Sequence, residues 1–476
     1  MGITAYFCGA LLLLLWYRVL VRHSVDKTQV QLRQNIILVK NMPYAIPTPE
    51  AYQVHFSSAT HIKQLIQAPD AHLSLHALAK DMFQPTHTMD GLTVDDCMSA
   101  NGTIHQRALQ AELRSQLPAL TQPLSECIAR TLTKEVSQAS GSPAAFGDGW
   151  RALQLFPLAK RLVVSANALV FFGPEVSSNP IFLNAALEYP EHMMQTAETL
   201  RLLPSALTVL LDTLIPIVER RLLENQSRPE QAEAPVPRDC IQFFVNAVKH
   251  KKQLDKWHAQ RIVQVLLGIW FASVHQPAMC LFYALDDLCL HPEYVVPLRE
   301  KISQALQIDL STLPLLDAFL KESARLHPTD SISVRRKALR PFVFSDGTNL
   351  AKGDVACIPM QPALQNPESY VDPLTFNPHR FLKDTMTSTN LSSSRSRFTD
   401  VDVAFPIWGL GKHACPGRLY ASLLLKLVLA HVLLRFEIKL PDGNRRSEKR
   451  SFYWRSAIVP RSGAVLYFRE RGSCTE

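Results

Sequence analysis

The sequence predicts a mainly α-helical protein with a smaller β region, folded as one large domain of residues 28–470 behind an N-terminal membrane anchor of residues 1–22. Three observations support this prediction. Apolar residues recur at three- and four-residue spacing through most of residues 91–290, which is the period of an amphipathic helix. Proline is frequent (32 residues) and glycine is scarce (17), as in helices separated by proline-containing loops. Residues 330–360 instead alternate like strands around an Asp-Gly turn.

The N-terminal segment has the composition of a transmembrane helix. Residues 2–17 carry no charged side chain, and the apolar run extends to Val21 if Arg18 reaches back to the interface. The basic residues Arg22 and Lys27 follow this run, which favours an anchor over a cleaved signal peptide. By the positive-inside rule, the rest of the chain is then expected in the cytosol.

The other elements follow in order along the chain. We expect mixed strands and short helices (28–90), helices (91–225), a polar linker (225–239), one long helix (254–290), another helix (311–328), strands (330–360), a Ser/Thr-rich loop (383–400), and a glycine-rich loop that runs into an apolar helix (403–440). The long helix is apolar on every side, so we expect it in the domain centre. A membrane span is the alternative, against which its polar residues Arg261, Gln264 and His275 argue.

Charge and cysteine usage narrow the function. The formal net charge is +8, but no long Lys/Arg run with interleaved aromatic residues is present, so nucleic-acid binding is not indicated. The nine cysteines form no Cys-x-x-Cys pair. An odd number of scattered cysteines argues against a zinc knuckle or a disulfide framework and fits reduced thiols in the cytosol.

A glycine-rich loop is the strongest chemical signal. "WGLGKHACPGRLYA" places Gly409, Gly411, Cys415 and Gly417 just before a helix. Glycine permits close backbone approach to a flat ligand. The positive end of the helix dipole favours thiolate at Cys415, and a thiolate suits a soft metal centre. The simpler interpretation is a turn with a buried cysteine.

This loop resembles the haem-thiolate loop of cytochromes P450, particularly the fungal form Gly-Lys-His-Ala-Cys-Pro-Gly-Arg. The resemblance implies that Cys415 is the axial ligand of the iron of haem b, within the P450 fold. It implies that Gly411 and Gly417 belong to the cofactor site and that His413 contacts a haem propionate. Trp408 stands where the family usually has Phe, so it would shield the sulfur and could donate its indole N–H to it.

Three further motifs extend the resemblance. Glu322-Ser-Ala-Arg325 matches the ExxR motif, although Glu198-Thr-Leu-Arg201 has the same spacing. The motif around Arg380 would complete a buried Glu-Arg-Arg triad. "ISVRRKAL" resembles the strand whose arginine reaches a propionate, and either Arg335 or Arg336 fits. The family's usual Trp-x-x-x-Arg pattern is not found, and His105 and Arg107 are its weak substitutes, with a solvated helix face as the alternative.

The long helix contains a polar break that the resemblance places over the distal haem face. Ala272 and Ser273 keep small volume beside bound oxygen, and His275 and Gln276 replace the usual acid and Thr. Pro277 has no N–H, so the Ser273 carbonyl would be freed toward the pocket and bind water. We hypothesise that His275 relays protons and Gln276 orients water. The alternative is a structural kink with a satisfied His and Gln.

Together these features and the resemblance imply a single-pass membrane-bound monooxygenase of the endoplasmic reticulum, of the fungal secondary-metabolism type, with a cytosolic catalytic domain. The expected partners are O2, an apolar substrate that enters past helices within 155–215, and NADPH-cytochrome P450 reductase, which would dock on Lys412, His413, Arg418, Arg395 and Arg397. The expected role is the synthesis of a fungal terpenoid, polyketide or alkaloid. Desaturation, ring coupling, an oxygen-independent rearrangement and non-catalytic haem binding are the alternatives.

Overall fold

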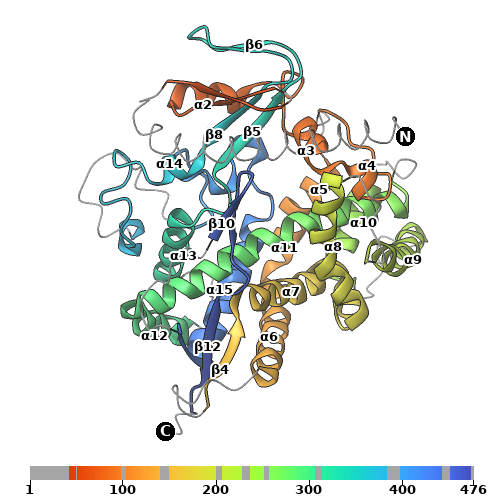
Figure 1. Cartoon of the computed structure of the whole chain (residues 1–476). Helices are drawn as coiled ribbons and strands as arrows, with labels where there is room; N and C mark the ends of the chain where they lie inside the picture. The colour runs from red at the N-terminus through yellow and green to blue at the C-terminus, as the bar shows by residue number, and fades with distance from the viewer. Residues whose placement is uncertain are drawn as a thin grey trace, which may run out of the picture.

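The computed structural model describes residues 42–49, 51–97, 103–139, 149–199, 206–227, 236–250, 257–305, 313–382, 397–441 and 451–472. The anchor predicted for residues 1–22 lies outside these residues. Within them, the prediction of a mainly α-helical chain with a smaller β region is confirmed (Figure 1).

Helices form most of the described chain. They are α2 (Ala59–Gln67), α3 (Leu75–Phe83), α4 (Pro85–Thr88), α5 (Ile104–Arg107), the π-helical turn η2 (Ala108–Leu113), α6 (Arg114–Gln138), α7 (Leu155–Ser177), α8 (Pro180–Thr199), α9 (Ala206–Ser227), α10 (Cys240–His250), α11 (Ala259–Leu290), α12 (Val295–Ala305), α13 (Pro314–Leu326), α14 (Met360–Leu364) and α15 (Arg418–Arg435). Short 3-10 turns are η5 (Pro292–Tyr294), η7 (Pro378–Phe381), η9 (Pro406–Trp408) and η10 (Gly411–His413).

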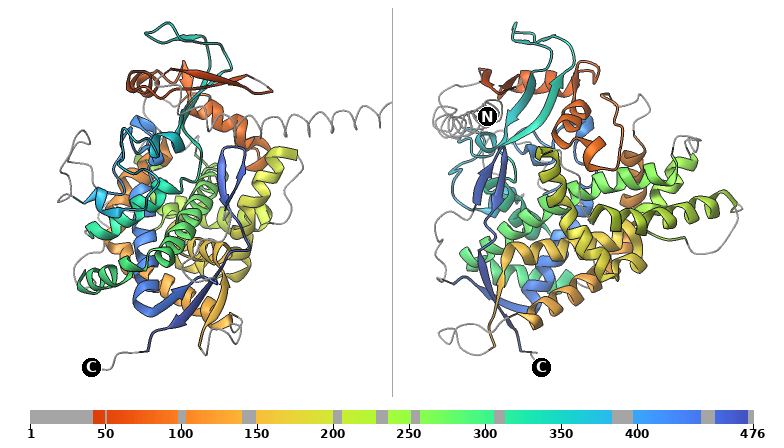
Figure 2. Two further views of the ribbon diagram at one scale, coloured as in Figure 1. Left: turned by 60° about the vertical axis from the view of Figure 1, so that its left-hand side comes forward. Right: turned by 45° about the vertical axis from the view of Figure 1, so that its right-hand side comes forward.

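The long helix α11 runs through the middle of the helical part (Figures 1 and 2). It contacts α7, α8, α9, α13 and α15, and Trp270 at its centre is fully buried. Both α7 and α11 are long and apolar enough to cross a membrane. Their apolar surfaces instead pack in the common helical core, as expected for an all-round apolar helix in a large domain.

The strands form sheets at two ends of the molecule (Figure 1). One sheet has the order β1-β2-β8-β5-β3, and a second has the order β4-β12-β9. Two hairpins, β6–β7 and β10–β11, complete the set. The strands are β1 (Tyr44–Pro47), β2 (Tyr52–His55), β3 (Leu73–Ser74), β4 (Arg151–Gln154), β5 (Ile332–Ala338), β6 (Phe342–Val343), β7 (Asn349–Leu350), β8 (Val355–Pro359), β9 (Phe436–Lys439), β10 (Ser451–Trp454), β11 (Ala457–Pro460) and β12 (Val465–Glu470).

Two differences from the expected elements have physical causes. The helical range 91–225 contains the short strand β4, which is stabilised by pairing with β12 near the C-terminus, a partner that local periodicity does not reveal. Helix α7 departs from helical geometry at Gly173, where φ is +85°. Glycine tolerates this conformation, and Pro174 follows it directly.

Candidate active site

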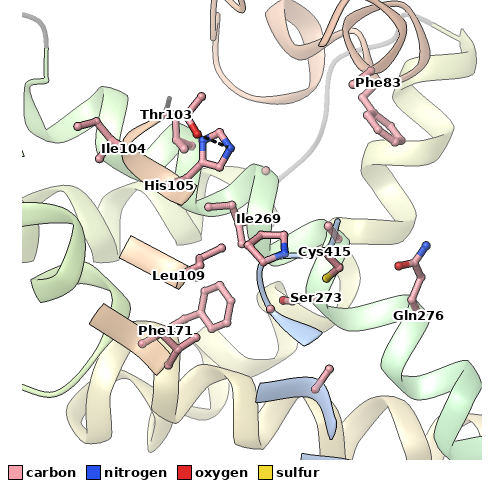
Figure 3. Close-up of a pocket in the computed structure, with 18 of the residues that line it drawn as sticks. Phe83, Thr103, Ile104, His105, Leu109, Phe171, Ile269, Ser273, Gln276 and Cys415 are labelled. Carbon is pink, nitrogen blue, oxygen red and sulfur yellow. Dashed lines mark hydrogen bonds between the residues drawn. The ribbon is translucent and has the colours of Figure 1, made fainter. Parts of the chain in front are cut away.

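A cavity of about 960 Å³ lies between α11 and the loop before α15. Helix α11 contributes Ala272, Ser273 and Gln276, and the loop contributes Cys415 and Gly417. Most of the other lining side chains are aliphatic or aromatic; those labelled in Figure 3 are Phe83, Ile104, Leu109, Phe171 and Ile269. The structure therefore brings the two segments that the sequence singled out to one largely apolar cavity.

The loop conformation depends on glycine. Gly411 has φ +65°, and a Cβ there would lie 2.2 Å from Cγ2 of Ile66 on α2. Gly409 also has positive φ, at +70°. The backbone amide of Cys415 donates to the carbonyl of Trp408 at 2.7 Å, which closes the loop. A side chain at Gly411 would thus push this loop away from α2.

The Cys415 side chain is half-buried, and its thiol accepts from the backbone at the start of α15. Burial raises its pKa, whereas hydrogen bonds from the backbone of Gly417 and Arg418 and the charge of Arg418 lower it. The net direction is upward, so the helix start does not by itself produce the thiolate that the sequence suggested. Metal ligation would supply the missing driving force, because a coordinated thiol is deprotonated.

Trp408 does not have the predicted hydrogen bond. Its indole N–H donates to the carbonyl of Phe398 at 2.7 Å, and its ring packs against the Phe398 ring with centroids 5.0 Å apart. The expectation that Trp408 donates to the sulfur was therefore wrong in this structure, because the backbone carbonyl takes the N–H. The indole still lines the cavity beside Cys415.

A basic cluster surrounds Asp70 next to the thiolate loop. His413 Nε2 and Lys412 Nζ each lie 3.0 Å from Asp70 Oδ1. The His413 ring lies near His76, with centroids 6.5 Å apart. The charge of Arg336 lowers the pKa of both His413 and His76, although burial is the larger cause for each. Lys412 and Arg336 are thus the cations of this cluster, Asp70 and Asp95 are carboxylates that act on it, and the lowered pKa favours the neutral form of both histidines.

This cluster distinguishes the two candidate arginines of β5. The Arg335 guanidinium is occupied by an ion pair with Asp330 and a 3.1 Å hydrogen bond to Ser456 Oγ. Arg336 is only 3% exposed, and its guanidinium donates to the Arg335 carbonyl at 2.7 Å. Because Arg336 interacts electrostatically with His413, His76 and Asp70, it is the arginine on the side of the thiolate loop.

Glu322, Arg325 and Arg380 meet in a buried triad. The Glu322 carboxylate accepts two hydrogen bonds from Arg325, at 2.7 and 2.8 Å, and one from Arg380 at 3.1 Å. The backbone amide of Asn377 adds a fourth, at 2.9 Å. Glu322 and Arg325 are fully buried. Charge pairing and hydrogen bonds thereby compensate the cost of burying these ions. The second ExxR match, Glu198 to Arg201, ends outside the described residues.

The distal helix presents only part of the predicted oxygen-handling set. Ala272, Ser273 and Gln276 line the cavity, but His275 does not. The charged groups that influence His275 are Lys160 on α7 and Glu191 on α8, and burial lowers its pKa to about 4. The role of His275 as a proton relay is therefore not supported, because one residue along a helix turns the side chain to a different face.

The Ser273 carbonyl is also placed differently from the prediction. It accepts a 2.8 Å hydrogen bond from Asn167 Nδ2 on α7. Pro277 does remove the helical donor, as the sequence indicated, but a protein amide takes its place and the carbonyl is not left to water. Sequence reasoning missed Asn167; the signal was a single amide in the otherwise apolar stretch "VVSANALVFF".

Of the two residues predicted to substitute for the family's Trp-x-x-x-Arg pattern, His105 lines the cavity and Arg107 does not. His105 lines the cavity and its ring lies 2.9 Å from Thr103 Oγ1 (Figure 3). Burial, and to a smaller extent the nearby His76, lowers its pKa to about 4. Arg107 is not among the residues that line this cavity.

Phe171 is the only lining residue from 155–215 in the described chain, so the expectation that helices of this range line the entrance was too broad.

These residues fit a metal carried by a macrocycle. In the ranges that the structure describes, no three or more His, Cys, Asp or Glu side chains form a group that could hold a metal ion. A metal on the lone thiol of Cys415 therefore needs other ligands from a non-protein group. A Cβ on Gly417 would meet nothing within 4 Å, which leaves room for a flat group beside the sulfur. Arg336 and the neighbouring histidines His413 and His76 could bind carboxylate groups carried by such a macrocycle. Fold and site together define a haem-thiolate protein.

Comparison with known proteins identifies the family. The model of the family "Cytochrome P450" matches residues 185–466. The chain is 32% identical over 386 residues to an ent-kaurene oxidase of Gibberella intermedia, covering 77% of this chain and 70% of that protein. It is 28% identical to cytochrome P450 monooxygenase olcJ of Penicillium canescens, covering 81% and 73%, and 28% identical to cytochrome P450 monooxygenase paxP of Penicillium paxilli, covering 68% and 66%. The chain belongs to the cytochrome P450 family and is a haem-thiolate monooxygenase.

Proposed function

We propose that this monooxygenase oxidises an apolar small molecule in the biosynthesis of a fungal secondary metabolite, with a terpenoid as the first substrate class to test. The observation that supports this proposal most directly is the wall of the cavity that contains Cys415, which is mainly aliphatic and aromatic. Such a wall binds apolar skeletons through burial of surface and orients them through a few polar groups. The ent-kaurene oxidases among the relatives support the terpenoid class.

The cofactor proposed is haem b with Cys415 as its axial ligand. Bound there, the haem supplies the activation of dioxygen, to which a thiolate ligand contributes electron density. The backbone of Gly417 and Arg418 donates hydrogen bonds to the sulfur. Arg336, His413 and His76 would bind the propionate carboxylates of the haem. Ala272 and Ser273 keep the facing part of α11 small.

Gln276 is the polar side chain of α11 that we propose handles water in the distal part of the cavity. It lines the cavity, and its carboxamide has no hydrogen-bond partner among the described residues. A carboxamide can donate to and accept from water but does not exchange its protons as an acid does. Proton delivery would then depend on water that Gln276 orders or on the substrate itself.

Because Gln276 is not an acid, reactions other than hydroxylation are a second possible outcome. With a carboxamide at position 276, desaturation, ring coupling or rearrangement competes with hydroxylation when the substrate supplies the proton. Product analysis under labelled O2 separates these outcomes. We expect one labelled oxygen in the product; its absence would favour the second group of reactions.

The electron donor proposed is NADPH, through NADPH-cytochrome P450 reductase. Lys412 and Arg397 are exposed near the thiolate loop; Lys412 pairs with Asp70 but keeps an exposed side chain, so both residues can meet an acidic partner. His413 and Arg418 were expected on the same surface, but they are turned inward: His413 pairs with Asp70, and Arg418 donates to the carbonyls of Cys415 and Thr399. Arg395 lies outside the described residues.

A direct test combines the purified chain with reductase, NADPH and ent-kaurene. We expect oxidised product that requires both NADPH and Cys415, with Cys415→Ser as the inactive control. A wild-type protein that binds thiolate haem but consumes no NADPH with any terpenoid, polyketide or alkaloid tested would contradict the proposed function.

We also propose that residues 1–22 anchor the protein in the membrane of the endoplasmic reticulum by a single pass. Deletion of residues 1–22 should then release the protein from the membrane fraction.

A further inference from the structure

Pro277 creates a chemical problem inside α11. In a regular helix the N–H of residue 277 would bond the carbonyl of Ser273, four residues earlier. Proline has no N–H, so this carbonyl loses its helical donor in the protein core. Yet α11 continues unbroken from Ala259 to Leu290. A buried carbonyl without a partner is costly, so another group has to satisfy it.

Asn167 supplies the donor from a different helix. This side chain on α7 is fully buried. Its Nδ2 lies 2.8 Å from the Ser273 carbonyl oxygen and 3.2 Å from Ser273 Oγ. Ser273 Oγ in turn donates to the carbonyl of Trp270 at 2.8 Å. Asn167 therefore holds both polar groups of Ser273.

The other end of the Asn167 amide reaches the helix that follows Cys415. The hydroxyl of Tyr420 on α15 lies 2.7 Å from Asn167 Oδ1. A carbonyl can only accept, so Nδ2 must face Ser273 and Oδ1 must face Tyr420, which donates. Tyr420 stands five residues after Cys415 in the sequence and lines the same cavity. The chain of bonds thus runs from the thiolate helix through α7 to the distal helix.

We propose that Asn167 is a positioning residue that replaces the backbone donor lost at Pro277 and, through Tyr420, fixes the distal segment 272–276 relative to Cys415. Each polar atom in this chain has a partner, which makes it a stiff connection in a low-dielectric core. The Ser273 carbonyl is consequently unavailable to water in the cavity. The functional part of this proposal rests on the haem-thiolate site described above.

A double-mutant cycle tests the replacement itself. Asn167→Leu keeps the branched side-chain shape and the number of side-chain heavy atoms but removes the donor. Pro277→Ala restores a backbone N–H at the position that can bond the Ser273 carbonyl. We expect Asn167→Leu to lower the unfolding temperature, and Pro277→Ala to raise it more in the Asn167→Leu background than in the wild type. Equal effects of Pro277→Ala in the two backgrounds would overturn the proposal.

Two controls make the cycle specific. Ser165→Ala removes another polar side chain of α7, one that bonds Thr131 on α6 at 2.8 Å, so Pro277→Ala should not rescue it. In the Asn167→Leu background the Tyr420 hydroxyl has lost its acceptor, Asn167 Oδ1. Tyr420→Phe removes that hydroxyl and should therefore lower the unfolding temperature little further.

Coupling of electrons to product tests the positioning role. Peroxide released per NADPH consumed should rise several-fold in the Asn167→Leu holoenzyme and fall back in Asn167→Leu/Pro277→Ala. A lower unfolding temperature with unchanged peroxide release would show that Asn167 only stabilises the core and would overturn the positioning role. Failure of the proposed function would look different, because the wild-type protein itself would then lack NADPH-dependent turnover while the unfolding cycle still reports on Asn167.

Discussion

The backbone amide of Cys415 donates to the carbonyl of Trp408 at 2.7 Å, while the Trp408 indole N–H is held by the Phe398 carbonyl. Trp408 therefore supports the thiolate loop through its backbone and ring, and its N–H points to another acceptor. The sulfur receives its hydrogen bonds from the backbone of Gly417 and Arg418. The groups that act on the sulfur are thus these backbone amides and the charge of Arg418, and the Trp408 indole N–H is not one of them.

Trp408→Phe should preserve the thiolate signature. The substitution keeps an aromatic ring and the backbone bond but removes the hydrogen bond to Phe398, which costs about 1 kcal/mol of unfolding free energy. Denaturant unfolding measures that loss, and redox titration of the holoenzyme measures the effect at the iron. A large shift in reduction potential would contradict the placement of the indole N–H.

Two glycine substitutions separate folding from cofactor binding. Gly411→Ala should destabilise the protein by more than about 1 kcal/mol, because φ is +65° and the new methyl group would overlap Ile66. Gly417→Ala meets nothing within 4 Å and has no positive φ, so the fold should persist. Its methyl group would intrude on the cavity, so haem content per protein should fall. Normal haem content in Gly417→Ala would contradict the position proposed for the cofactor.

Gln276 and His275 are adjacent but should behave differently. Gln276→Ala should increase peroxide release per NADPH several-fold, because Gln276 lines the cavity. His275→Ala should change this ratio little, because His275 does not line the cavity and burial keeps it neutral near pH 7. Stopped assays for NADPH and peroxide measure both ratios. Strong uncoupling in His275→Ala would restore the relay hypothesis that the structure does not support.

The buried triad should dominate stability. Glu322→Gln leaves the Arg325 guanidinium charged and fully buried without its counterion, which is expected to cost about 3–5 kcal/mol. Arg380→Lys should cost less, because the Arg380 side chain is 11% exposed and shares Glu322 with Arg325. Unfolding midpoints of the two variants provide the comparison. Equal small losses would mean that the triad is not a structural ion cluster.

Arg336 and Arg335 should have separable roles. Arg336→Leu should accelerate haem transfer to a haem acceptor protein, because it removes the buried cation beside His413 and His76. Arg335→Leu should instead lower stability through loss of its ion pair with Asp330, with little effect on haem transfer. The reverse pattern would assign the propionate to Arg335.

The sequence was most informative where a function depends on contiguous residues. The loop around Cys415 could be predicted because glycine spacing, the cysteine and the following helix are local features. The Glu322–Arg325 pair could be predicted because a helix places residues three apart side by side. Helix α11 could be predicted from its length and apolar composition.

Relations between distant elements could not be predicted in the same way. Asn167 and Ser273 are 106 residues apart, and only the packing of α7 against α11 brings them together. The face to which His275 turns depends on the rotation of α11 in the core, which an all-round apolar helix does not reveal. The acceptor for the Trp408 indole is likewise decided by the fold of the preceding loop.

The central claim is that Cys415 binds haem iron as a thiolate, and the reduced-CO difference spectrum of the purified holoenzyme tests it most directly. The predicted result is the long-wavelength Soret band of thiolate-ligated haem in the wild type and its loss in Cys415→Ser. A wild-type spectrum without that band, or the same band in Cys415→Ser, would contradict the account.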